Sequence, residues 1–196
     1  ILADEKEVSR EAAARLLSQM PDKKQIVREF LRYTRGIAFW LRDRIFESMK
    51  SISHSIRDAV LDLLDDQDEA IRIDSMFLAA YIEDGRMIPK ITRIVESNMD
   101  WWVRTSAIEI LLKLKAPTLP SILEKYHEDE DLKWSIISVY GELKKPSTIG
   151  FLQECLNDSS RFIKIASLRA LAKFDHPKVP TILKQTAENE NEWAVW

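Results

Sequence analysis

The sequence is poor in cysteine and glycine. Its single cysteine, Cys155, can form neither an internal disulfide nor a cysteine-rich zinc site. The glycines lie too far apart for a G-x-G-x-x-G motif or a P-loop, and a G-x-S-x-G elbow is absent as well. A lone cysteine fits a reducing compartment. We therefore expect a cytoplasmic protein, or the soluble part of a membrane-anchored one.

Long apolar runs and an excess of positive charge are also missing. No run approaches the ~18 residues that a membrane-spanning helix needs. The charged residues 4–7 are not followed by the apolar segment of a signal peptide. The 29 Lys and Arg residues are outnumbered by 32 Asp and Glu residues, for a formal net charge of -3. Proteins that coat DNA usually carry a strongly basic face, so the composition disfavours a nucleic-acid partner.

A regular repeat runs through the sequence instead. Six stretches of twelve residues align, and their starting positions are separated by 32, 30, 32, 29 and 31 residues. Their second position is always basic, and positions 1, 5, 8, 9 and 12 are mostly apolar. These apolar positions share one face of a helix, so each stretch predicts an amphipathic helix. The stretches are residues 9–20, 41–52, 71–82, 103–114, 132–143 and 163–174.

A second helical pattern lies between these stretches. Several of its segments begin beside proline, which the first turn of a helix tolerates, and end in acidic or amide residues that can cap the next helix. Each repeat therefore predicts two antiparallel helices, and no alternating strand pattern competes. The segments are residues 56–64, 88–95, 119–126, 149–156 and 179–187.

The order of these residues resembles the HEAT repeat in its short, bacterial-type form. Pro, L-x-x-L-L, Asp and V-R-x-x-A-x-x-A-L follow one another, and residues 103–107 and 163–171 are the closest matches. The resemblance covers nearly the whole chain. It implies an all-α fold, a right-handed α-solenoid of antiparallel helix pairs, without a cofactor. We expect residues 1–196 to form one array, with about five full repeats and partial repeats at both ends, within a longer chain.

The resemblance also implies roles for the basic second position. The V-R helix should line the concave surface, and its basic residue should pair with an Asp of the preceding turn. Asp66 with Arg72 and Asp158 with Lys164 fit this expectation. Gly36 and Asn98 stand where two further acidic residues would be needed, so we expect an incomplete series. The basic column is thus interpreted as structural, not as a row of phosphate ligands.

Candidate catalytic and metal-binding residues are few. Cys155 stands among leucines and predicts a buried apolar residue. The acidic clusters at 65–69 and 128–131 precede helices at equivalent places, which favours helix capping over a calcium loop or a carboxylate pair. The histidines lie too far apart to share a metal ion, and we expect neither a catalytic nor a metal site. They are His54, His127 and His176.

The strongest binding candidates are apolar residues on the outward face of the repeated helices. Positions 3, 7 and 10 should face a groove, and apolar residues there can anchor a protein or peptide partner. The alternative is that helix crossing buries them in the core. The predicted partner-binding residues are Ile73, Phe77, Tyr81, Leu112 and Trp134.

Two further surfaces remain open at the level of sequence. Residues 21–50 carry a surplus of four positive charges, which could meet RNA, acidic lipid or an acidic protein, or could be a solvated helix face. The predicted basic patch contains Lys23, Lys24, Arg28, Arg32 and Arg35. An aromatic stripe of Trp40, Trp102 and Phe162 precedes three of the repeated stretches, and either packing between repeats or binding would explain it.

These features predict a non-catalytic scaffold that binds a protein or peptide through its concave helix face. One alternative is a HEAT-like enzyme such as a DNA base glycosylase or a lyase. A glycosylase would need a basic groove with an acidic catalytic residue and a stacking Trp, and the net acidic charge disfavours it. The other alternative is a regulatory domain tethered to a larger, membrane-anchored protein.

Overall fold

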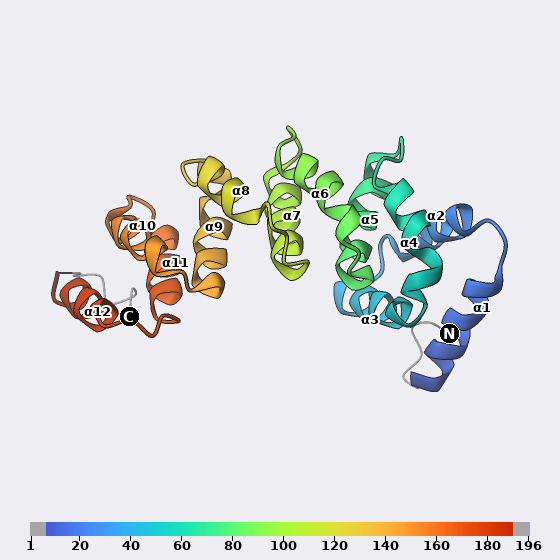
Figure 1. Ribbon diagram of the computed structural model, residues 1–196, viewed down its shortest axis with the longest axis horizontal. Helices are drawn as coiled ribbons and strands as arrows, with labels where there is room; N and C mark the ends of the chain where they lie inside the picture. Colours follow the sequence, from blue (N-terminus) through green and yellow to red (C-terminus); the bar gives the residue numbers. More distant parts are fainter. Residues whose placement is uncertain (1–6, 190–196) are drawn as a thin grey trace. The chain divides into compact units, whose positions relative to one another are not determined.

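The computed structural model describes residues 7–189, in which helices are joined by turns and no strand occurs. The aromatic C-terminal residues Trp193 and Trp196 lie outside the described residues. The chain divides into two compact units, unit 1 (Ile1–Ala116) and unit 2 (Pro117–Trp196), and each is described by itself. In both units short helices follow one another in pairs joined by tight turns (Figure 1).

Unit 1 stacks its repeated helices side by side. The helices that correspond to the aligned twelve-residue stretches, here called the second helices, are α1, α3, α5 and α7, and each packs against the next. The other helices of unit 1, here called the first helices, are α2, α4 and α6. Among them α2 packs on α4, while α4 packs on the second helix α5 and α6 on the second helix α7. The helices are α1 (Glu7–Gln19), α2 (Lys23–Thr34), α3 (Phe39–Met49), α4 (Ser53–Leu63), α5 (Glu69–Ile82), α6 (Ile88–Val95) and α7 (Trp101–Lys113).

Unit 2 continues the same pairing, with second helices α9 and α11. They come so close that a Cβ atom added at Gly141 would lie 2.8 Å from Cα of Ala170. Apolar residues of α9, α10, α11 and α12 share one core, which includes Ile137, Leu152 and Ile182. The helices are α8 (Leu119–Tyr126), α9 (Glu130–Leu143), α10 (Ile149–Glu154), α11 (Arg161–Leu171) and α12 (Lys178–Asn189).

The structure confirms the predicted helix pairs and the all-α solenoid class. Each aligned stretch begins within two residues of a second helix, and α6 and α8 have the predicted bounds. The sequence pattern did not single out α2, whose apolar positions Val27 and Leu31 nevertheless face the core. The handedness of the solenoid and a single array across both units stay predictions.

Acidic residues before the helices act as caps, as predicted. The side chain of Asp68 accepts a hydrogen bond from the backbone N–H of Ala70 at the start of α5, and Asp129 does the same for Asp131 at the start of α9. Pro89 and Pro120 lie in the first turns of α6 and α8, where their missing N–H costs no helical hydrogen bond. The acidic clusters therefore begin helices, because carboxylates satisfy exposed N–H groups there.

The carboxylates of the two expected aspartates pair with cations of the preceding repeat. The carboxylate of Asp66 accepts two hydrogen bonds from Arg28 of α2, at 3.0 and 3.2 Å, while Arg72 donates to the backbone oxygen of Asp66. Asp158 pairs with Lys133 of the preceding second helix at 2.6 Å. The cationic hydrogen bonds hold the pKa of both aspartates below the ordinary value. The ion pairs thus link neighbouring repeats, which is why spacing within one turn did not reveal them.

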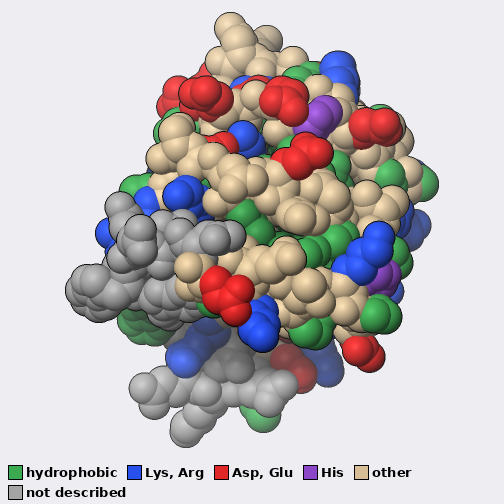
Figure 2. Space-filling view, turned by 90° about the vertical axis from the view of Figure 1, so that its left-hand side faces the viewer, with side chains coloured by type: hydrophobic (Ala, Val, Ile, Leu, Met, Phe, Trp, Pro, Cys, Tyr) green, Lys and Arg blue, Asp and Glu red, His purple; other side chains and the backbone are tan. Residues whose placement is uncertain are grey.

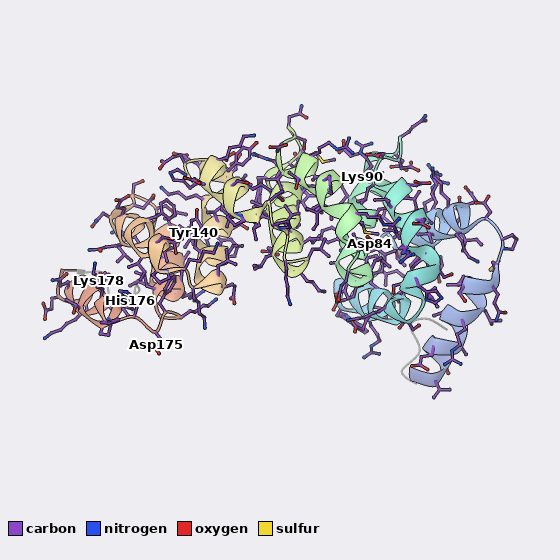
Figure 3. The ribbon with its side chains drawn as sticks, in the orientation of Figure 1. Asp84, Lys90, Tyr140, Asp175, His176 and Lys178 are labelled. Atoms are coloured by element: carbon purple, nitrogen blue, oxygen red, sulfur yellow. The ribbon has the colours of Figure 1, made fainter. Side chains whose placement is uncertain are left out.

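Exposed ion pairs also join the first helices of unit 1. Arg86, in the short 3₁₀ turn before α6, binds Asp84 beside it and Asp58 of α4. Lys90 of α6 donates to the backbone oxygen of Leu61 at the end of α4 (Figure 3). These contacts join α6 and the turn before it to α4.

Candidate partner-binding faces

The outward face of α3, α5 and α7 in unit 1 contains a hollow of about 220 Å³. Three aromatic rings form its apolar part: Phe46 is fully buried, while Phe77 and Tyr81 are partly exposed. The ring of Phe46 meets Tyr81 edge-on, with centroids 6.0 Å apart. The floor of the hollow is therefore apolar, and the rings at its rim are partly accessible to solvent.

Cations of the same unit cover the rings of this hollow. The guanidinium of Arg42 lies 5.0 Å from the ring centroid of Phe77, and the ammonium of Lys113 lies 4.2 Å from that of Tyr81. The hydroxyl of Tyr81 donates a hydrogen bond to Asp43. Cation–π contacts of this kind contribute about 0.5–1 kcal/mol at exposed sites. Phe77 and Tyr81 of unit 1 thus already make cation–π contacts with residues of α3 and α7.

A buried carboxylate holds Arg42 in place. Asp74, in the middle of α5, is 5% exposed and accepts hydrogen bonds from Arg35 at 3.3 Å and from Arg42 at 3.5 Å. Burial raises the pKa of Asp74, although the two arginines oppose that shift. On the rim, partial burial of the Glu109 carboxyl group raises its pKa as well. Asp74, Arg35 and Arg42 thus form one ionic group beside the hollow of unit 1.

The equivalent face of unit 2, between α9 and α11, contains a hollow of about 200 Å³ with a different lining. Its rim carries Trp134, which is 51% exposed, and Phe162, which is 77% exposed. The small buried residues Ala166 and Ala170 form its floor. The cations on this face are Arg169 and Lys173, and Lys173 pairs with Glu142 at 2.5 Å. This face leaves its aromatic rings open to solvent.

The structure divides the predicted partner-binding residues between the two units. Phe77 and Tyr81 line the hollow of unit 1, and Trp134 lies on the rim of the hollow of unit 2. Ile73 and Leu112 are partly exposed and belong to neither hollow. None of the five is fully buried. Their role in binding stays a prediction, and they form two separate groups in place of the one cluster expected.

The predicted basic patch is largely neutralised by its surroundings. Lys23 donates to the backbone oxygens of Ser18 and Met20 at the end of α1. The other four members pair with carboxylates, so the surplus of charge counted from the sequence does not create a free cationic surface here. Their partners are Asp62 for Lys24, Asp66 for Arg28, Glu29 for Arg32 and Asp74 for Arg35.

The aromatic stripe is exposed, so packing between repeats does not explain it. Trp40, Trp102 and Phe162 all keep a large part of their surface in solvent, as does the neighbouring Trp101. In unit 1 the guanidinium of Arg44 lies 5.9 Å from the ring of Trp40, next to a second hollow that shares Asp43 with the first. All three residues stand directly before an aligned stretch, and this shared position is the sequence feature that could have predicted their exposure.

The histidines and the cysteine have structural surroundings. The ring of His127 packs edge-on against Phe151, and Nδ1 of His176 accepts a hydrogen bond from the backbone N–H of Lys178 at the start of α12 (Figure 3). His54 is exposed. Cys155 is buried, as predicted, and burial raises the pKa of its thiol, which makes it a poor nucleophile.

Within 7–189, no cluster of three or more His, Cys, Asp or Glu side chains is arranged to hold a metal ion. No helix in that part of the chain combines the length and the apolar character needed to cross a bilayer.

Comparison with known proteins adds one match. A family model for HEAT repeats matches residues 117–195, which is almost all of unit 2. No curated protein sequence matches the chain. The matched region contains α11, and with it residues 163–171, one of the two closest matches to the HEAT repeat; the other, residues 103–107 in α7, lies before it.

Proposed function

Since residues 117–195 of this chain match the HEAT-repeat family, we propose that the chain is a scaffold that binds a protein or peptide partner through the outward faces of its second helices. HEAT repeats commonly serve as protein-interaction scaffolds. The two hollows lie on second helices, between neighbours that a rigid apolar core holds in place. A preorganised surface of this kind binds without a large ordering cost.

The exposed aromatic rings carry this proposal. Trp134 and Phe162 are large apolar side chains that are more than half exposed, and so are Trp40 and Trp101 in unit 1. Aromatic residues are enriched among the side chains that dominate binding at protein interfaces. Groups of such rings beside a hollow mark contact surfaces on soluble proteins.

Selection of peptides from a random displayed library tests the proposal with the full chain as bait. We expect wild-type protein to enrich peptides that the double variant Phe77→Ala, Trp134→Ala no longer binds, because each substitution removes an anchor from one face. The matched control is Arg57→Ala, Lys184→Ala, which truncates one exposed side chain on a first helix of each unit. It should keep the selected peptides.

Circular dichroism separates a lost contact from a lost fold. Both double variants should retain wild-type helicity. If the aromatic variant unfolds, its side chains belong to the core; if it stays folded and keeps every selected peptide, partners bind elsewhere. Either result rejects the second-helix faces as the binding surface.

A further inference from the structure

The hollow of unit 2 presents two aromatic rings that no other described group covers. No cation and no second ring stacks on Trp134 or Phe162 within residues 7–189, in contrast to Phe77 and Tyr81 in unit 1. The volume of about 200 Å³ is below the roughly 300–1,000 Å³ typical of small-molecule pockets. A hollow of this size suits one side chain of a segment that lies across α9 and α11.

The charged groups that line this hollow are both cations. Lys173 is occupied by Glu142, whose pKa it holds below the ordinary value. Arg169 is exposed, and in the described part of the chain it has no carboxylate partner. A guanidinium donates two parallel hydrogen bonds to a carboxylate, so Arg169 can bind an acidic group brought by a partner.

We propose that this hollow binds an acidic peptide segment of a partner protein, in which an apolar side chain stands next to Asp or Glu. The apolar side chain lies between Trp134 and Phe162, and the neighbouring carboxylate binds Arg169. This inference rests on the proposed scaffold function and specifies the partner chemistry for unit 2. Complementary charge then selects the partner, while the aromatic rings supply most of the affinity.

The surroundings of the hollow favour a peptide over a nucleic acid. Two cations, one of them paired, cannot follow a run of phosphates. The acidic residues 128–131 lie at the N-terminal end of α9, one turn before Trp134, and would repel a polyanion. Figure 2 likewise shows Asp and Glu side chains interspersed with Lys and Arg over the described part of the face it presents. A short segment with one local acidic group avoids these carboxylates.

Fluorescence anisotropy with labelled synthetic peptides tests the inference on the full chain. One peptide carries a single Phe flanked by Glu, a second replaces each Glu by Lys, and a third probe is a single-stranded oligonucleotide. We expect the acidic peptide to bind, and Trp134→Ala to weaken it about 30-fold, as the loss of a central aromatic anchor does. Arg169→Glu should weaken it at least about 10-fold and favour the basic peptide instead.

Lys184→Glu is the matched control, because it makes the same charge change on α12, outside the hollow. It should alter the binding of the acidic peptide less than about 3-fold. If it weakens binding as much as Arg169→Glu does, net charge and not the hollow determines affinity, and the inference is overturned. Tighter binding of the oligonucleotide that depends on Arg169 would overturn it in favour of nucleic acid.

The two proposals fail in different ways. If peptides selected from the random library bind through Trp134 but the acidic peptide does not, the inferred chemistry is wrong and the scaffold function stands. If neither the library nor the designed peptides bind through the second helices, both proposals are wrong.

Discussion

The outward faces of the two units are built from equivalent helices, but among the described residues cations cover the aromatic rings only in unit 1. In unit 1, Arg42 is held by buried Asp74 and lies over Phe77, so a cation of the same unit covers one ring of the hollow. In unit 2, the rings of Trp134 and Phe162, which stand at other positions of the repeat, are open. The same backbone pattern therefore supports one face whose rings are covered by cations of their own unit and another whose rings are open.

The position of one acidic residue accounts for much of this difference. Asp74 is the fourth residue of its aligned stretch, and Ser106, Ser135 and Ala166 stand at that position in later repeats. Only a carboxylate there can draw arginines inward across the second helices. Where the position is small and uncharged, as at Ala166 in unit 2, it leaves room for a hollow whose cations face solvent.

The largest effect should come from the tight helix contact of unit 2, which has no counterpart at a glycine of unit 1. Gly141→Ala places a methyl group 2.9 Å from Cβ of Ala170 and must push α9 away from α11. We expect a loss of about 2–3 kcal/mol in the free energy of unfolding of unit 2. Amide hydrogen exchange, followed separately for peptides of unit 1 and unit 2, measures this loss as reduced protection in unit 2.

Gly150→Ala is the control for this substitution. Gly150 lies in α10, and a Cβ atom added there meets nothing within 4 Å. It should leave unit 2 unchanged or more stable, since alanine favours a helix over glycine. Equal destabilisation by the two variants would show that the contact of α9 with α11 does not limit stability.

The next largest effect concerns the ionic network of unit 1. Asp74→Ala removes the acceptor shared by Arg35 and Arg42 and leaves a small cavity in α5. We expect unit 1 to lose about 1–2 kcal/mol, with unit 2 unaffected. Burial makes the ionised carboxylate costly, so Asp74→Asn, which keeps an acceptor without the charge, should cost much less. If the Asn variant is as unstable as the Ala variant, the negative charge itself holds the two arginines.

How far the sequence predicted this structure depends on the range of the interactions involved. Apolar periodicity within twelve residues located the second helices, because a helical face is a local property. The partners of the charged residues were not predictable in the same way: Arg28 binds Asp66 from 38 residues away, and Arg42 binds Asp74 from 32. These contacts depend on how repeats stack, which a pattern within one repeat does not contain.

The exposure of the candidate site residues was only partly predictable for the same reason. Phe77 and Trp134 occupy outward positions of their helices, and the sequence gives both the same expectation. Their surroundings differ because Arg42 covers Phe77, whereas no described cation covers Trp134. The side chain that covers a ring comes from the neighbouring repeat, so the contrast between the two faces emerges only in three dimensions.

Acid should affect the two units differently. Hydrogen bonding to Lys133 lowers the pKa of Asp158, so this aspartate stabilises unit 2 above its unfolded pKa of about 3.9, and the contribution is lost as the pH falls through its folded pKa. The pKa of Asp74 is raised, so its contribution is present at low pH and is lost as the pH rises. Asp158→Asn should therefore flatten the acid destabilisation of unit 2, measured as unfolding between about pH 5 and pH 2.

The matched substitution in unit 1 is Asp74→Asn, which should leave the response of unit 2 unchanged. Asp74→Asn should also reduce the stability that unit 1 gains at low pH from the raised pKa of Asp74. An unaltered pH profile of unit 2 in Asp158→Asn would mean that the Lys133 pair does not contribute to its stability.

The smallest effect should distinguish two equivalent helix ends. Glu83 and Lys144 follow α5 and α9 and both adopt the left-handed conformation, with φ of 57° and 50°. Glycine takes this conformation without strain, so Lys144→Gly should stabilise unit 2 by up to about 1 kcal/mol. Glu83→Gly should gain less in unit 1, because it also removes the ion pair with Lys50 at 3.1 Å. Thermal unfolding of both variants measures the difference; a larger gain at Glu83 would show that this exposed pair opposes folding, since such pairs normally contribute at most about 1 kcal/mol.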